Sequence, residues 1–105
     1  MAAYVVCIMS IHDPETYRRY TALTPPTVTR HGGRFLTRGD SVLTAEGEAF
    51  SERQVILEFP DTAAAQAWIA DPDYVAAAKF RKAASTGRMT IQEGRSNSAD
   101  PDPKV

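Results

Sequence analysis

Three side chains in the central part of the chain have chemistry suited to binding an anion or moving a proton. His31 is a candidate general acid or base by residue type, while Glu58 is a candidate base or a partner for an arginine. Arg38 carries a planar fork of donors that fits a carboxylate. Each residue also has a structural interpretation, in which Arg38 and Glu58 form an ion pair and His31 stabilises a helix end. The residue types leave both interpretations open.

Aromatic residues with helical spacing form a second candidate feature. We expect Tyr17, Trp68 and Tyr74 to project from helices toward a sheet, where a cleft could expose their phenol and indole donors. Arg81 follows Tyr74 by seven residues and therefore lies on the same helix face. An aromatic stripe is more often core, and Arg81 could be a solvated or salt-bridging helix residue. These four are candidate substrate-binding residues, with packing as the alternative.

Several classes of site have no support in the sequence. The two histidines have no cysteines or clustered carboxylates nearby, so we expect no metal site. The chain has no nucleophile elbow, and no phosphate-loop pattern follows Gly32-Gly33, so we expect no cofactor. Cys7 is the single cysteine and cannot form an internal disulfide. A formal net charge of -1 gives no electrostatic basis for binding nucleic acid.

Length and composition predict one globular domain. The chain has 105 residues, of which 43% are hydrophobic and 24% charged. Its apolar runs are too short to cross a membrane, and its first residues lack the basic stretch of a signal peptide, so we expect a cytoplasmic protein. We assign residues 1–94 to the domain and residues 95–105, rich in Ser, Asp and Pro, to a disordered tail.

Caps and apolar patterns predict the elements that would position the candidate residues. Asp13-Pro14 and Asp71-Pro72 each combine an N-cap with a proline suited to the first helical position, and Asp61 is a further cap. Pro25-Pro26 should break or kink the first helix, and Gly39-Asp40 should be a bulge within one long second strand. The expected elements are a strand over 3–11, a helix from 14 to about 31, a strand over 34–47, a loop over 48–52, a strand over 53–59, helical segments after Asp61 and from 72 to 84, with Gly87 ending the last helix, and a strand over 88–94.

This order of elements predicts a ferredoxin-like α+β fold. Strand, helix, strand, strand, helix, strand with right-handed crossovers gives a four-stranded antiparallel sheet with the helices on one face. The strands over 3–11 and 53–59 are apolar on both faces, so the face without helices would be a large apolar patch. A second copy of the chain would cover it. We therefore expect a homodimer through the open sheet face, with two sheets enclosing a barrel-like core.

The chain also resembles a known family. The residues that carry the resemblance, spread over positions 3 to 94, are Asp13-Pro14, Tyr17, Tyr20, the run from Gly32 to Gly39, Glu46-Gly47, Glu58-Phe59-Pro60, Ala67-Trp68, Tyr74 and Arg81. They resemble the bacterial "domain of unknown function 1330" family, which implies a ferredoxin-like fold and a dimeric α/β barrel. The wider group includes cofactor-free monooxygenases, small isomerases and decarboxylases, and haem-binding enzymes. Ile69 stands where the family commonly has a second aromatic residue.

Two functional interpretations follow. In the first, a small homodimer binds a small organic molecule, anionic if Arg38 holds it, in a cleft between helices and sheet. If that protein is an enzyme, which the residues leave open, its chemistry would be cofactor-independent proton transfer or oxygenation, with His31 or Glu58 moving protons. In the second, the protein is a non-enzymatic structural or interaction module without a ligand cleft, and its aromatic residues are all core.

Overall fold

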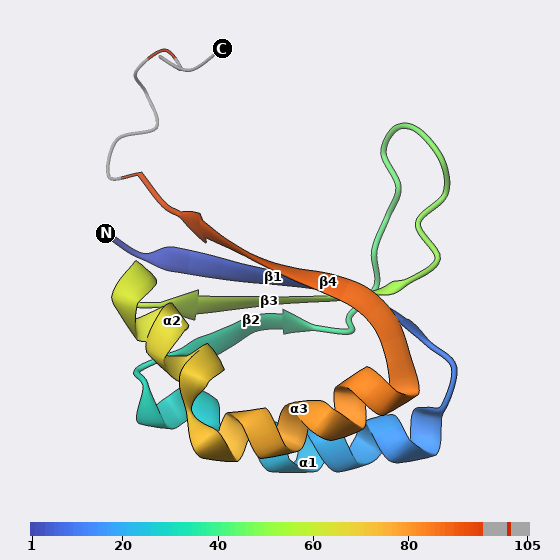
Figure 1. Cartoon of the computed structure of the whole chain (residues 1–105). Coiled ribbons are helices and arrows are strands. Elements are labelled where there is room, and N and C mark those ends of the chain that lie inside the picture. The colour runs from blue at the N-terminus through green and yellow to red at the C-terminus, as the bar shows by residue number, and fades with distance from the viewer. Residues whose placement is uncertain (96–100, 102–105) are drawn as a thin grey trace.

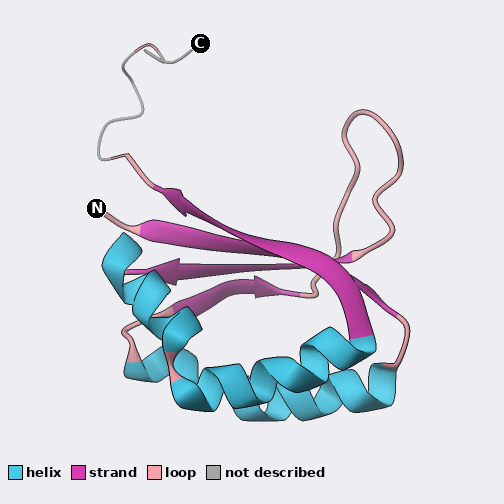
Figure 2. Cartoon of the chain, viewed as in Figure 1, coloured by secondary structure: helices cyan, strands magenta, loops and turns pink. Residues whose placement is uncertain are grey.

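A computed structural model describes residues 1–95 and residue 101 (Figures 1 and 2). The elements in chain order are β1 (Ala3–Ile11), α1 (Pro14–Arg30), β2 (Arg34–Arg38), β3 (Arg53–Phe59), α2 (Thr62–Ala70), α3 (Pro72–Ala84) and β4 (Ser85–Glu93). The bounds of β1 and β3 agree with the prediction. The tail predicted over 95–105 lies almost entirely outside the described residues.

The four strands form one antiparallel sheet in the order β2-β3-β1-β4. The two central strands, β1 and β3, are the ones whose sequences are apolar at both parities, which suits strands flanked on both edges. The helices all lie on one side of the sheet, with α1 and α3 side by side (Figure 1). This is the ferredoxin-like α+β arrangement, as the sequence predicted.

An aspartate caps the start of each helix. The carboxylates of Asp13 and Asp61 accept hydrogen bonds from the backbone N–H groups of Thr16 and Ala64, at 3.1 and 2.7 Å. Asp71 accepts from the N–H of Asp73 at 2.8 Å and thereby starts α3 directly after α2. All three caps were predicted from the sequence, because a carboxylate satisfies N–H groups that have no partner within the helix.

The predicted break at Pro25-Pro26 is wrong: α1 runs as one helix through both prolines to Arg30. Two prolines remove two N–H groups and leave the carbonyls of Thr21 and Ala22 without their helical donors. Those residues are half-buried and exposed, so their carbonyls can be hydrated. Packing against the rest of the protein then keeps the helix continuous although two backbone hydrogen bonds are missing.

The second strand is shorter than predicted, and the expected bulge lies elsewhere. β2 ends at Arg38, and the register against β3 shifts between Phe35 and Thr37, so the bulge is at Leu36. Gly39 leaves the strand with a positive φ of 73°. Residues 39–52 form a long excursion without strand or helix, which we call the arm. The sequence favours a bulge at Gly39-Asp40 because the apolar pair Val42-Leu43 beyond it has the composition of a strand.

Gly87 does not end α3, contrary to the prediction from the sequence. The helix ends at Ala84, and β4 begins at once with Ser85. Gly87 pairs with Met9 in the sheet, where an added Cβ would overlap the backbone of β1. The glycine thus permits a close strand approach within β4 rather than a helix stop.

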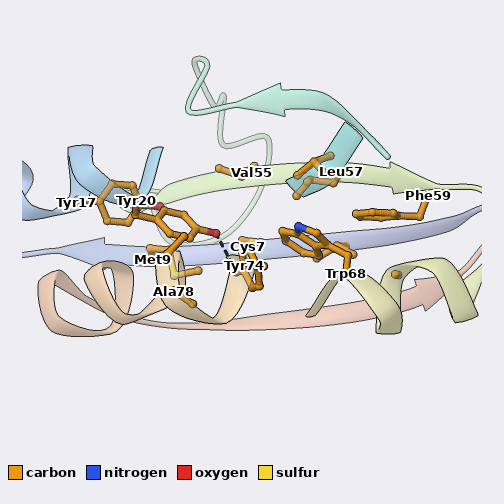
Figure 3. Packing of buried hydrophobic residues seen from close by; sticks show 14 of the residues in the cluster. Cys7, Met9, Tyr17, Tyr20, Val55, Leu57, Phe59, Trp68, Tyr74 and Ala78 are labelled. Carbon is orange, nitrogen blue, oxygen red and sulfur yellow. Dashed lines mark hydrogen bonds between the residues drawn. The ribbon is translucent and has the colours of Figure 1, made fainter. Parts of the chain in front are cut away.

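A cluster of aromatic and aliphatic side chains fills the space between the sheet and the helices (Figure 3). Trp68 lies between Phe59 and Tyr74, with ring centroids 5.3 and 4.1 Å away. The sheet contributes alternate residues of β1 and β3, each less than a tenth exposed: Val5, Cys7 and Met9 with Val55, Leu57 and Phe59. Both strands were predicted to be apolar on both faces, and side chains alternate along a strand, so one of the two sets lies in this core.

The other parity of the same strands faces away from the helices and is only half-buried. It consists of Tyr4, Val6 and Ile8 on β1 with Gln54, Ile56 and Glu58 on β3. This open face is the one that the sequence analysis assigned to a second copy of the chain. No helix among the described residues is long and apolar enough to cross a membrane.

Candidate functional site

A narrow cavity lies between α1 and the sheet. Its lining comes from β1, α1, β2, β3 and α2 and consists of Cys7, Met9, Tyr17, Tyr20, Thr21, Thr24, Phe35, Arg38, Arg53, Val55, Leu57 and Trp68. About 20 Å³ is open to the centres of water molecules, which is room for one or two waters. The cavity is therefore mostly apolar, with two arginines among its lining residues.

The two arginines lie on neighbouring strands. Arg38 ends β2 opposite Val55, is exposed, and lies over the ring of Phe35 with its guanidinium carbon 4.2 Å from the centroid. Arg53 begins β3, is half-buried, and lies 5.6 Å from the centroid of the Tyr17 ring. Its Nε is buried and has no hydrogen-bond partner among the described residues. Buried guanidinium donors normally have a partner, so this N–H can donate a hydrogen bond to a ligand oxygen.

Three buried tyrosines, Tyr17, Tyr20 and Tyr74, form what we call the tyrosine cluster. The hydroxyls of Tyr20 and Tyr74 are 2.9 Å apart and share a hydrogen bond (Figure 3). Burial raises the pKa of each of the three phenols above its ordinary value. Burial also raises the pKa of the nearby Cys7 thiol to about 11. These groups are therefore neutral at physiological pH and cannot serve as bases there.

Arg81 lies behind the tyrosine cluster. Its guanidinium carbon is 5.7 Å from the centroid of the Tyr20 ring, and its Nε is buried without a partner among the described residues. It does not line the cavity, and neither does Tyr74. Its positive charge, on the α3 side, lowers the electrostatic energy of any anion placed nearby.

The indole donor of Trp68 is already used inside the fold. Its Nε1 donates to the hydroxyl of Thr27 at 3.0 Å, and that hydroxyl donates to the carbonyl of Thr24 at 2.6 Å. Trp68 is fully buried. It lines the cavity with its ring and offers no free donor to a ligand, so its contribution there is shape.

His31 and Glu58 lie away from the cavity lining. His31 is 2.7 Å from the carboxylate of Asp71, through its Nε2, at the junction of α1 with the α2-α3 corner. Glu58 belongs to the open face of β3 and accepts from Nε of Arg34 at 2.8 Å. Strand parity explains the separation, because Glu58 has the opposite parity to Val55 and Leu57, which line the cavity. The structure therefore brings Arg38, Tyr17 and Trp68 together, with Tyr74 and Arg81 behind them.

Asp71 is the centre of a small polar network at that corner. It accepts hydrogen bonds from Arg30 at 2.8 Å and shares one with His31. The hydrogen bond with His31, together with those from Asp73 and Arg30, lowers the pKa of Asp71 to about 2. The arrangement is that of a structural node, since its carboxylate also caps α3.

Sequence reasoning missed Arg53 as a site residue. The available signal was parity: Arg53 precedes Val55 and Leu57 by two and four positions, so it faces the same side as the core of β3. A charge on that side needs a partner or an opening to solvent. Within the described residues, no group of three or more His, Cys, Asp or Glu side chains is placed to hold a metal ion.

The fold is ferredoxin-like, and a narrow cavity lies between α1 and the sheet. The chain belongs to the DUF1330 family, a domain of unknown function, whose family model matches residues 2–95. None of the curated proteins matches the chain.

Solved structures with this fold include proteins of known and unknown function. A protein of unknown function from Rhodopseudomonas palustris, RPA0582, is 24% identical over 91% of this chain and 84% of its own, with a TM-score of 0.75. SnoaB, a cofactor-independent oxygenase from Streptomyces nogalater, is 19% identical over 94% and 98% of the two chains, with a TM-score of 0.62. A dimeric protein of unknown function with a ferredoxin-like fold from Bacteroides fragilis NCTC 9343 is 11% identical over 89% and 96%, with a TM-score of 0.59.

Proposed function

We propose that this protein binds a small aromatic molecule with an ionised oxygen in the cavity between α1 and the sheet. The observation that carries the proposal is the buried Nε of Arg53, which has no partner among the described residues and belongs to a mostly apolar lining. A phenolate, enolate or carboxylate oxygen would accept this hydrogen bond, and an aromatic ring would pack against Tyr17, Trp68 and Phe35.

Arg38 gives such a molecule a way in. The residue is exposed and rests on Phe35, so its side chain can swing away and lengthen the cavity without disturbing the strand. Its guanidinium would then pair with the bound anion beside that of Arg53. The alternative, a filled interior in a non-enzymatic module, predicts that no ring enters.

The charges of the lining define what it can do to a ligand. Among the residues that line it, Arg38 and Arg53 are the two that carry charge at neutral pH, and both are positive. Two cations in an apolar space stabilise the ionised form of a bound acid and lower its pKa. A weakly acidic phenol or enolisable ketone would therefore ionise on binding without a protein base.

His31 and Glu58 stay proposed as proton-moving residues only for a larger substrate that reaches beyond the cavity. His31→Asn and Glu58→Gln test this separately. If either residue takes a proton, its variant loses turnover while the dissociation constant of a bound anion is unchanged. If both variants turn over substrate as fast as the wild-type protein, neither residue takes part in the mechanism.

Oxygenation is a second candidate, favoured by the shared fold with the cofactor-independent oxygenase SnoaB. A bound enolate would transfer an electron to O₂, and the two radicals would combine to form a carbon–oxygen bond. The peroxide then takes up a proton, and loss of water leaves a carbonyl, so one oxygen atom enters the product and the other enters water. An oxygen electrode with 2-tetralone, an enolisable aromatic ketone, measures this. Oxygen uptake that depends on protein and on Arg53 supports it, whereas uptake equal to the protein-free rate contradicts it.

The binding proposal is tested by titrating 4-nitrophenol, whose ionised form absorbs visible light. We expect the pKa of the bound phenol to fall by about one unit or more, as it does beside an opposite charge. Arg53→Met and Arg38→Met should reduce the shift. Arg34→Met is the matched control, because Arg34 is on the same strand as Arg38 but pairs with Glu58 on the other face. No shift in the wild-type protein, or an equal loss in the control, would overturn the proposal.

We further propose that two copies join through the open faces of their sheets and form an α/β barrel. The half-buried side chains Val6, Ile8 and Ile56 supply the apolar contact, and the dimeric neighbour from Bacteroides fragilis has the same kind of fold. Sedimentation velocity tests it. A dimer that Val6→Glu converts to a folded monomer is the expected result, and a wild-type monomer would contradict it.

A further inference from the structure

The arm, residues 39–52, is the most prominent feature that the cavity does not use. It rises from the side of the sheet opposite the helices, away from the body of its own chain (Figure 1). Its outer part carries two apolar residues, Val42 and Leu43, which are 42% and 92% exposed. Two exposed branched aliphatic residues together on an outlying segment point to a contact outside the chain.

The arm holds its shape through local hydrogen bonds. At its root the N–H of Gly39 donates to the carbonyl of Gln54 at 3.1 Å. The Asp40 carboxylate accepts from Thr37 and Arg38 of β2, at 2.8 and 3.0 Å. Farther out, the N–H of Phe50 donates to the hydroxyl of Thr44 at 2.8 Å. A segment ordered in this way loses less conformational entropy when it docks.

The charge of the arm is one-sided. It contains four acidic residues and neither lysine nor arginine; the acids are Asp40, Glu46, Glu48 and Glu52. On the open face, Arg88 of β4 is exposed and has no ion-pair partner among the described residues. An acidic arm and a free arginine on the open face are complementary between two copies of the chain.

A groove on the open face can receive the apolar part of the arm. It is lined by Ile8, Phe50, Glu52, Gln54, Thr86, Gly87 and Arg88 and has about 540 Å³ of space open to water. Ile8 and Phe50 supply apolar surface, Arg88 contributes a positive charge, and Glu52, which like Phe50 belongs to the root of the chain's own arm, contributes a negative one. This space is large enough for two aliphatic side chains.

We propose that the arm of one protomer docks in this groove on a second copy, with Val42 and Leu43 against Ile8 and Phe50, and Glu46 and Glu48 beside Arg88. The inference rests on the proposed open-face homodimer and adds a reciprocal contact to it. Two-fold symmetry makes each chain both donor and acceptor of an arm.

The docked arm also completes the ligand site. Gly39, its first residue, lies against the Arg53 guanidinium so closely that an added Cβ would overlap it. Docking fixes the arm root and with it the position of Arg53 at the cavity. The second copy is therefore expected to sharpen anion binding without touching the ligand.

Sedimentation velocity with matched variants tests the arm contact. Leu43→Asp places a charge in the groove and should weaken the dimer by about tenfold or more. Val75→Asp is the control, since Val75 on α3 is 46% exposed on the helical side and should leave the dimer unchanged. If Leu43→Asp leaves the dimer intact while Val6→Glu breaks it, the arm inference is overturned and the open-face dimer stands. A monomeric wild-type protein overturns both.

A charge exchange and a cross-link identify the pairing. Arg88→Glu should weaken the dimer, and adding Glu46→Lys and Glu48→Lys to the same chain should restore it. In a symmetric dimer of the triple variant, each contact joins the changed groove of one protomer to the changed arm of the other. Mixed and oxidised Glu48→Cys and Arg88→Cys chains should yield a disulfide between the two different variants. Absence of both the rescue and the mixed disulfide in a dimeric protein would refute the docking.

Discussion

The hydrogen bond from Trp68 to Thr27 allows a quantitative test of how α1 is held on α2. Thr27→Val keeps the side-chain shape but removes the acceptor, leaving the indole N–H buried without a partner, which costs about 1–3 kcal/mol. Trp68→Phe removes the donor and some volume from a fully buried site, and should cost about 2 kcal/mol or more. In the double variant no orphaned N–H remains. The two losses should therefore sum to more than the double variant loses, with a coupling of about 1–2 kcal/mol.

Urea unfolding followed by far-ultraviolet circular dichroism measures this cycle, because the chain has a single tryptophan and one variant removes it. A coupling below about 0.5 kcal/mol would show that the two sites act independently. That result would refute the argument that the indole donor is committed to α1 and is unavailable to a ligand.

Three further predictions concern stability. Because the pKa of Asp71 is lowered, its ionised carboxylate contributes to the free energy of unfolding above pH 3.8, and this contribution is lost as the pH falls toward about 2. Asp71→Asn should therefore be less stable at neutral pH, and its free energy of unfolding, measured by chemical denaturation, should depend less on acid pH. An unchanged acid dependence would contradict this. The pKa values of the tyrosine cluster are raised in the folded protein, so the protein loses stability as the pH rises above 10, where the unfolded chain ionises more readily. Tyrosinate absorbance from these rings should therefore appear only with unfolding. Gly33→Ala would push a Cβ into the Phe59 ring and should cost about 1–3 kcal/mol, whereas an unaffected midpoint in urea would show that the ring moves freely.

Local signals in the sequence predicted most of the fold. The caps at Asp13, Asp61 and Asp71 were recognisable because a carboxylate before a helix satisfies specific N–H groups, whatever the tertiary setting. The prediction of a break at the prolines of α1 was wrong because their intrinsic effect is outweighed by the packing of α1 on α3 and in the core cluster. At Gly39, the sequence could not distinguish a bulge from a strand end, since both need the same left-handed backbone.

The site was less predictable, because parity and partner choice depend on the tertiary structure. Glu58 was paired with Arg38 in one interpretation, but the bulge at Leu36 and the register place it opposite Arg34. His31 was a candidate by residue type, and its partner Asp71 is far away in sequence. To identify Arg53 from the sequence, the core-facing parity of Val55 and Leu57 has to be extended back to the first, charged residue of the strand.

The central claim is that Arg53 donates to a bound anionic oxygen, and its Nε–H proton reports on this directly. The measurement is a proton–nitrogen correlation spectrum of the arginine Nε–H groups, assigned with Arg53→Lys and recorded before and after addition of 4-nitrophenol. The account predicts a large downfield shift and slower solvent exchange for Arg53, with the Arg34 signal unchanged. An unmoved Arg53 signal at saturating 4-nitrophenol, or equal shifts of both arginines, would contradict it.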